Sequence, residues 1–216
     1  MNSNPLTFRF DEENDRLVEE YEAAREQEKK NDLQRLYEKS GVPSKFYNED
    51  INTYIAETEE EKHNKKVVSD FIKAPGNRIL ILCGKNGNGK SHLGCSALRN
   101  IYGLYISSLD LCIEYESAVS FNAPRTRQAL LRSLIEPDLV VIDECMKYTT
   151  NPELEKFILS YVGNTRYENN KALIYITNDT KKNFVKFLGK STFDRMTEVC
   201  TTLEFTQESR RREFRK

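Results

Sequence analysis

A short glycine-rich segment has the residue types and the spacing that bind phosphate groups. Residues 84–91 read Gly-Lys-Asn-Gly-Asn-Gly-Lys-Ser, which matches the pattern G-x-x-x-x-G-K-[ST], between an apolar run and a helix-compatible segment. Glycines let backbone N–H groups surround a triphosphate at the positive end of the following helix. Lys90 can reach the β- and γ-phosphates, and the Ser91 hydroxyl can bind Mg²⁺. We therefore expect ATP and Mg²⁺ as cofactors, with these cofactor-binding residues: Gly84, Lys85, Asn86, Gly87, Asn88, Gly89, Lys90, Ser91 and His92.

Two acidic residues end an apolar run further along the chain. Residues 138–144 read Asp-Leu-Val-Val-Ile-Asp-Glu, the pattern of a buried strand followed by paired carboxylates. Such a pair is costly unless a cation meets it. Asp143 is expected to hold Mg²⁺ through its water shell, together with Ser91, and Glu144 to polarise the attacking water as a general base. The pair favours hydrolysis over phosphoryl transfer to a small molecule.

A third polar side chain, Asn178, follows the apolar run 172–177. Its amide offers a donor and an acceptor together, so it can contact both the γ-phosphate and the lytic water. His92 directly follows Ser91, and His63 lies in a charged segment. Neither histidine has a catalytic partner nearby in the sequence, which favours structural roles for both.

The elements that must position these residues alternate between strand and helix. Strand-like runs are 78–83, 103–107, 138–143, 172–177 and 200–205, and helical patterns are 59–73, 109–119, 126–135 and 152–167. This alternation predicts an α/β fold with a parallel sheet covered by helices on both faces. Ligands of such sheets bind at the carboxyl ends of the strands, where all the polar motifs above lie.

The first part of the chain has a different character. Residues 11–39 are highly charged, with a thin apolar stripe at roughly helical spacing, and Ser40-Gly41 followed by Pro43 is typical of a helix end. A solvated helix packed loosely on the core and a docking arm for a partner protein both fit this pattern. We expect residues 1–40 to form a helical partner-docking extension and residues 41–216 to form the ATPase domain.

Composition narrows the classes of protein to which the chain can belong. A formal net charge of −1 predicts no global attraction to nucleic acid, so any DNA contact needs a local basic patch. The five cysteines show no C-x-x-C spacing and indicate reduced core thiols of a cytoplasmic protein. No apolar run approaches membrane-spanning length, and the acidic N-terminal segment is unlike a signal peptide.

Taken together, the motifs resemble the AAA+ helicase loaders of the DnaC and DnaI type and the related IstB transposition ATPases. The resemblance runs from about Leu36 to the C-terminus. It rests on the order and spacing of these segments: residues 40–43 and 46–47, 89–93, 141–144, 164–168, 177–178 and 193–196. It implies the strand order 5-1-4-3-2 and an ATPase that places a DnaB-type hexameric replicative helicase on single-stranded DNA. It also implies self-association into an open ring or spiral, in the bacterial cytoplasm, as a host or phage protein.

The same resemblance suggests roles for five arginines. Arg195 lies where the family's sensing arginines cluster and is expected to act as the arginine finger of a neighbouring subunit, with Arg166 as the reserve candidate. Arg125, Arg127 and Arg132, interleaved with Tyr115 and Phe121, are expected to contact single-stranded DNA.

Several features depart from the family pattern. Cys145-Met146 stands where relatives usually have a glycine soon after the acid pair, and Ser191 stands where many have an arginine. No cysteine precedes Cys83, so the zinc module of some relatives is not expected. Because the sequence ends soon after the fifth strand, we expect no helical lid of the kind found in larger AAA+ proteins.

Three other functions remain open from the sequence. An IstB-like transposition regulator would clamp duplex DNA, but the acidic segment 11–28 disfavours that by repulsion. A small-molecule kinase would need an acceptor pocket and an arginine-rich lid; the Thr177-Asn178 pair and the lack of an expected lid count against this function. A non-hydrolysing, nucleotide-switched interaction module fits the altered arginine pattern.

Overall fold

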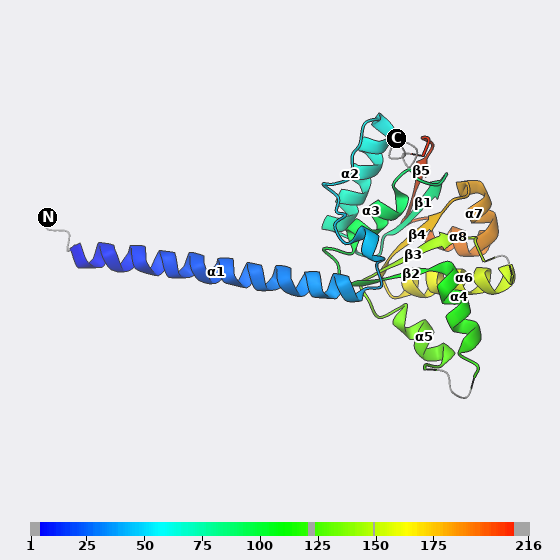
Figure 1. The fold of residues 1–216 in the computed structure, drawn as a ribbon, viewed down its shortest axis with the longest axis horizontal. Coiled ribbons are helices and arrows are strands. Elements are labelled where there is room, and N and C mark those ends of the chain that lie inside the picture. The colour runs from blue at the N-terminus through cyan, green and yellow to red at the C-terminus, as the bar shows by residue number, and fades with distance from the viewer. Residues whose placement is uncertain (1–4, 121–123, 149, 210–216) are drawn as a thin grey trace.

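The chain forms an α/β core from which one long helix extends (Figure 1). The computed structural model describes residues 5–120, 124–148 and 150–209, with side chains from residue 14 onward. The core sheet has five parallel strands in the order β2-β3-β4-β1-β5, which is 5-1-4-3-2 read from the other edge and confirms the expected order. The strands are β1 (Ile79–Gly84), β2 (Gly103–Ser107), β3 (Leu139–Cys145), β4 (Ala172–Thr177) and β5 (Cys200–Phe205).

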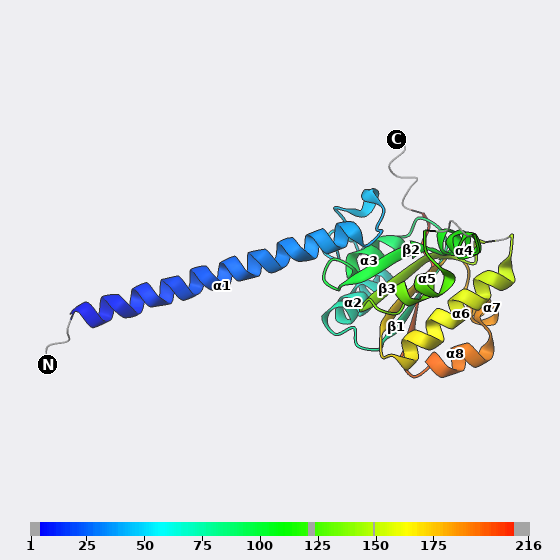
Figure 2. The ribbon, with the colours of Figure 1, turned by 90° about the horizontal axis from the view of Figure 1, so that it is seen from below.

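Helices cover both faces of this sheet, as the alternating pattern predicts. Alternate residues of each strand point to opposite faces, so the sheet contributes to two apolar clusters. One cluster packs under α2 and α3, and the other under α4 to α8 (Figure 2). The helices are α1 (Pro5–Lys39), α2 (Glu59–Lys73), α3 (Lys90–Ala97), α4 (Ser108–Ser117), α5 (Arg127–Ser133), α6 (Pro152–Glu168), α7 (Lys181–Leu188) and α8 (Lys190–Met196).

Helix starts follow local capping chemistry. Thr58 and Glu61 form a capping box at the start of α2, with the Thr58 hydroxyl accepting from the Glu61 N–H. The expected bounds of α2 and of strands β2, β4 and β5 are confirmed. Helices α7 and α8 were not expected from the sequence. Thr180 caps α7, and Gly189, with φ 90°, separates α7 from α8.

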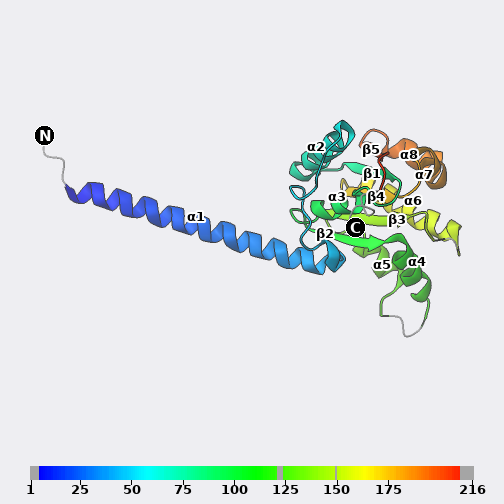
Figure 3. The same cartoon turned by 45° about the horizontal axis from the view of Figure 1, so that its top comes forward.

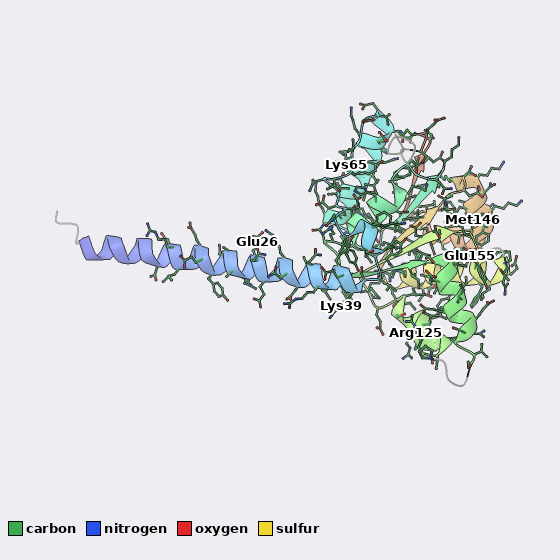
Figure 4. All side chains as sticks on the ribbon, viewed as in Figure 1. Glu26, Lys39, Lys65, Arg125, Met146 and Glu155 are labelled. Carbon is green, nitrogen blue, oxygen red and sulfur yellow. The ribbon has the colours of Figure 1, made fainter. Side chains whose placement is uncertain are left out.

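Helix α1 is longer than the sequence pattern predicts, because it begins at Pro5 rather than near residue 11. It leaves the core near the β2 edge of the sheet and projects away from it (Figures 1 and 3). Leu17, Val18 and Tyr21 are 58%, 55% and 69% exposed. Glu26 lies on the projecting part of the helix, and Lys39 lies where the helix meets the core (Figure 4).

The last turns of α1 nevertheless belong to the core. Tyr37 is 1% exposed and packs in the cluster under α2 and α3, and its hydroxyl donates to the Phe46 carbonyl at 2.9 Å. The Arg99 guanidinium lies 4.7 Å from the Tyr37 ring centre. The projecting part of the helix is therefore the portion before these turns.

The structure also bears on the cysteines and on the apolar character of the helices. All five cysteines are free, and all but Cys200 are buried, which agrees with reduced core thiols. Within the described segments, no helix combines the length and the apolar character needed to cross a bilayer.

Candidate functional site

The glycine-rich loop joins β1 to α3, the context that the phosphate-binding pattern requires. Gly89 precedes α3 with φ 88°, and a Cβ there would lie 2.4 Å from Cε2 of Tyr54. Only glycine fits this position without displacing that ring. The loop is also braced from inside, because the buried Asn88 side chain donates to the Phe205 carbonyl at 3.0 Å.

The ammonium group of Lys90 lies inside the glycine-rich loop. Its buried Nζ donates to the carbonyl oxygens of Gly84 and Lys85 at 2.7 and 2.5 Å, and to Oδ1 of Asn88 at 3.0 Å. These bonds hold an ammonium beside the N-terminus of α3, where the helix dipole also favours an anion. Charge and backbone geometry therefore fit a polyphosphate.

The acid pair lies at an irregularity of the sheet. In the pairing of β3 with β4, Ile142 is opposite Tyr175 and Cys145 is opposite Thr177, so Asp143 and Glu144 together face the single intervening residue. Glu144 accordingly has φ 59°. The Thr177 hydroxyl donates to the Cys145 carbonyl at 3.0 Å and fastens the bulge. The bulge brings two successive carboxylates to the same end of the sheet.

Each carboxylate has a defined partner. Asp143 is buried, and its Oδ2 accepts from the Tyr105 hydroxyl at 2.8 Å while its Oδ1 accepts from the Glu144 N–H at 2.6 Å. Glu144 is half-buried, and its Oε1 lies 2.6 Å from Nζ of Lys147. Tyr105 and Lys147 were not identified from the sequence.

A buried glutamate holds the loop that follows the acids. One carboxylate oxygen of Glu155 accepts from the Met146 N–H at 2.7 Å and from the Ser108 hydroxyl at 2.5 Å, and the other accepts from the Tyr148 N–H at 3.2 Å. Met146 and Glu155 lie close together in Figure 4. Met146 has φ 69°, a left-handed backbone conformation that ordinarily favours glycine.

One cavity of about 530 Å³ brings most of the predicted residues together. Its lining includes residues 86–92, Asp143, Glu144, Lys147 and Asn178. The opposite wall was missed from the sequence and consists of Phe46, Glu49, Thr53, Tyr54, Ile55 and Glu57. A larger cavity of about 600 Å³ runs along β2 and contains none of the phosphate-loop residues or the acid pair, so the chemistry lies in the smaller one.

His92 connects the loop to this opposite wall. Its Nδ1 lies 3.0 Å from a carboxylate oxygen of Glu49, and its Nε2 lies 2.8 Å from the Asp50 carbonyl. The Tyr54 ring meets the imidazole edge-on, with 5.4 Å between ring centres. These contacts agree with the structural role expected for His92, although the residue also lines the cavity.

The structure contradicts the reserve role of Arg166. Its side chain is fully buried near the C-terminal end of α6, where the guanidinium donates to carbonyl oxygens of residues 134, 135, 137, 138 and 172. Burial lowers the pKa of this guanidinium to about 10, which leaves it a cation at neutral pH. A side chain enclosed in this way cannot reach a neighbouring subunit, so the prediction was wrong.

Arg195 is placed differently. It lies in α8 and is 59% exposed, with Nη1 3.5 Å from Glu168. Its exposure leaves the side chain accessible to another molecule.

The three arginines expected to contact DNA lie in or just before α5. Arg125 pairs with Glu114, and Arg127 stacks on Tyr115 with 4.5 Å between Cζ and the ring centre. Arg132 is exposed. Phe121, which the same expectation included, lies outside the described residues.

Comparisons with solved structures agree on the fold. The structure of the DnaC helicase loader has a TM-score of 0.65 at 18% identity, over 76% of this chain and 99% of that one. The DnaI structure has a TM-score of 0.60 at 15% identity, over 78% and 93%. The replication initiator DnaA bound to AMPPCP and single-stranded DNA has a TM-score of 0.62 at 16% identity, over 77% and 51%. Identities this low show the fold alone.

No sequence among curated proteins matches the chain. The family model described as IstB-like ATP binding protein matches residues 3–216. Because this model covers nearly the whole chain, the chain belongs to the IstB-like ATP-binding protein family.

Proposed function

We propose that this protein binds Mg²⁺–ATP in the cavity of about 530 Å³ and hydrolyses it to ADP and phosphate. The observation that carries the proposal is the convergence of the phosphate loop, both acids and Asn178 on that one cavity. Family membership supports nucleotide binding.

Each side chain has a distinct task in this proposal. Lys90 binds the β- and γ-phosphates, and Ser91 and Asp143 hold Mg²⁺. When bound, the metal neutralises charge on the phosphate oxygens. Glu144 orients and polarises the attacking water, and Asn178 contacts the γ-phosphate. Lys147 Nζ lies 2.6 Å from Oε1 of Glu144, and the other carboxylate oxygen can accept from water while this contact is kept.

Two variants separate binding from chemistry. Lys90→Ala removes the main cationic contact and should weaken binding of a fluorescent ATP analogue. Glu144→Gln should leave that affinity within about twofold and abolish phosphate release, because the amide cannot accept a proton. Equal affinity in wild type and Lys90→Ala would contradict the phosphate-loop assignment.

We further propose that the ATPase acts as a loader that brings a DnaB-type replicative helicase to single-stranded DNA, as part of a self-associated ring or spiral in the bacterial cytoplasm. The shared fold of DnaC and DnaI supports this, as does the projecting helix with its exposed Leu17, Val18 and Tyr21. Such a stripe suits docking of a helix on a partner groove. The acidic segment 11–28 weighs against an arm that grips duplex DNA, as an IstB-like transposition regulator would require.

Truncation of the arm tests the helicase proposal. The truncation removes residues 1–30, because Tyr37 packs in the core and must be retained. The truncated protein should bind ATP like the full chain and lose co-purification with a replicative helicase. Matched controls are Leu17→Glu and Tyr21→Glu, which change the stripe without shortening the helix. Full-yield co-purification of all three variants would place the docking surface elsewhere.

A further inference from the structure

Tyr105 lies between the candidate metal site and the base of the long helix. It belongs to β2, at the edge of the sheet, and its ring packs against the cluster under α2 and α3. In the register of β2 with β3, Asp143 is opposite Ser107, two residues further along the strand. The long side chain of Tyr105 therefore reaches Asp143 diagonally, and its hydroxyl donates to Oδ2 at 2.8 Å.

This hydrogen bond restricts the carboxylate that is proposed to hold Mg²⁺. Oδ2 accepts from Tyr105, and Oδ1 accepts from the Glu144 N–H at 2.6 Å, so both oxygens of Asp143 are held at once. Each carboxylate oxygen has about two lone-pair sites, so each keeps acceptor capacity for a metal-bound water. Outer-shell hydrogen bonds of this kind orient metal-binding carboxylates.

The phenol remains a donor under ordinary conditions. Burial, and after it the Asp143 carboxylate, raise the pKa of Tyr105 far above its usual value. A carboxylate oxygen can only accept from a phenol, so the 2.8 Å hydrogen bond runs from Tyr105 to Asp143.

The backbone of Tyr105 is hydrogen-bonded to the residue that follows α1. The Tyr105 N–H donates to the Ser40 carbonyl at 2.6 Å. Gly41 follows with φ 84°, and a Cβ at that position would lie 2.5 Å from the Tyr105 carbonyl oxygen. The junction of the helix and the core is thus fitted directly against the residue that holds Asp143, and Gly41 cannot gain a methyl group without pushing on β2.

We propose that Tyr105 is a positioning residue for Mg²⁺–nucleotide binding, and that the Ser40–Gly41 junction holds Tyr105 in place. The inference rests on the proposed nucleotide site and deepens it by naming a residue behind the metal-binding acid. It also links the base of the arm to the metal site through one side chain and one backbone hydrogen bond.

The test separates metal-dependent from metal-independent binding. A fluorescent ATP analogue is titrated into wild type and Tyr105→Phe, first with EDTA and then across a series of Mg²⁺ concentrations. Tyr105→Phe keeps the ring and removes only the hydroxyl. We expect the EDTA affinity to stay within about twofold and the Mg²⁺ midpoint to rise about tenfold, the lower end of outer-shell effects on metal affinity. The control is Tyr102→Phe, at a tyrosine just before the same strand that is 51% exposed.

A second pair of variants tests the junction. Gly41→Ala should raise the Mg²⁺ midpoint in the same direction. Gly76→Ala is its control, because Gly76 also has a positive φ, of 50°, but no atom lies within 4 Å of its added Cβ. An unchanged Mg²⁺ midpoint in Tyr105→Phe would overturn the positioning role. If the Mg²⁺ midpoint rose in Tyr105→Phe but stayed unchanged in Gly41→Ala, the role proposed for the Ser40–Gly41 junction would be overturned. Failure of the wild type to bind nucleotide would instead contradict the proposed function itself.

Discussion

Replacing Arg166 with methionine should destabilise the fold severely, although the family resemblance made this residue the reserve candidate for a contact across a subunit interface. Methionine has a similar length and no donor. The carbonyl oxygens of residues 134, 135, 137, 138 and 172 would all lose their hydrogen bonds from the guanidinium. A hydrogen bond to a charged group contributes roughly 1.5–3 kcal/mol, and water can re-enter the turn to recover part of it. We therefore expect a loss of about 3–5 kcal/mol in the free energy of unfolding.

Urea unfolding followed by circular dichroism measures this difference. Arg195→Met is the matched control, because its exposed ion pair with Glu168, at 3.5 Å, should contribute less than about 1 kcal/mol. If the free energy of unfolding of Arg166→Met lay within about 1 kcal/mol of the wild-type value, the structural role assigned to this guanidinium would be wrong.

Three further results are expected. If Arg195 acts on a neighbouring subunit's nucleotide, Arg195→Ala should bind ATP normally and hydrolyse it about 10³-fold more slowly, with partial recovery when mixed with Lys90→Ala protein; full turnover of Arg195→Ala alone would exclude it. If α5 contacts single-stranded DNA, Arg132→Ala should weaken salt-sensitive oligonucleotide binding measured by anisotropy with ATP, and no binding by wild type at low salt would refute the proposal. Glu155→Ala should lower the free energy of unfolding by about 2–4 kcal/mol, since it orphans the Met146 and Tyr148 N–H groups, and an unchanged urea midpoint would contradict that reading.

The sequence predicted the parts of the molecule in which local pattern and chemistry coincide. The phosphate loop carries its own context, since strand, glycines and helix are contiguous, and the apolar runs have the lengths of buried parallel strands. The strand order came with the family resemblance and is confirmed. Asp143 and Glu144 could be expected at one end of the sheet because parallel strands end together.

Side chains that act across the sequence could not be predicted in the same way. Alternation identifies Tyr105 as a strand residue, but its diagonal hydrogen bond depends on the register of β2 with β3. Arg166 occupies a helix end, where an arginine is ordinarily solvated; only the tertiary structure shows carbonyls converging on it. The wall around Tyr54 has no regular periodicity, so its place opposite the loop follows from packing alone.

Binding and hydrolysis of ATP in the cavity can be tested in one set of assays. Nucleotide affinity and phosphate release are measured together for wild type, Lys90→Ala and Glu144→Gln, with and without Mg²⁺. We expect binding and turnover by wild type, weakened binding by Lys90→Ala, and binding without turnover by Glu144→Gln. If Lys90→Ala bound nucleotide as tightly as wild type, or if Glu144→Gln still released phosphate, the proposed ATPase site would be wrong.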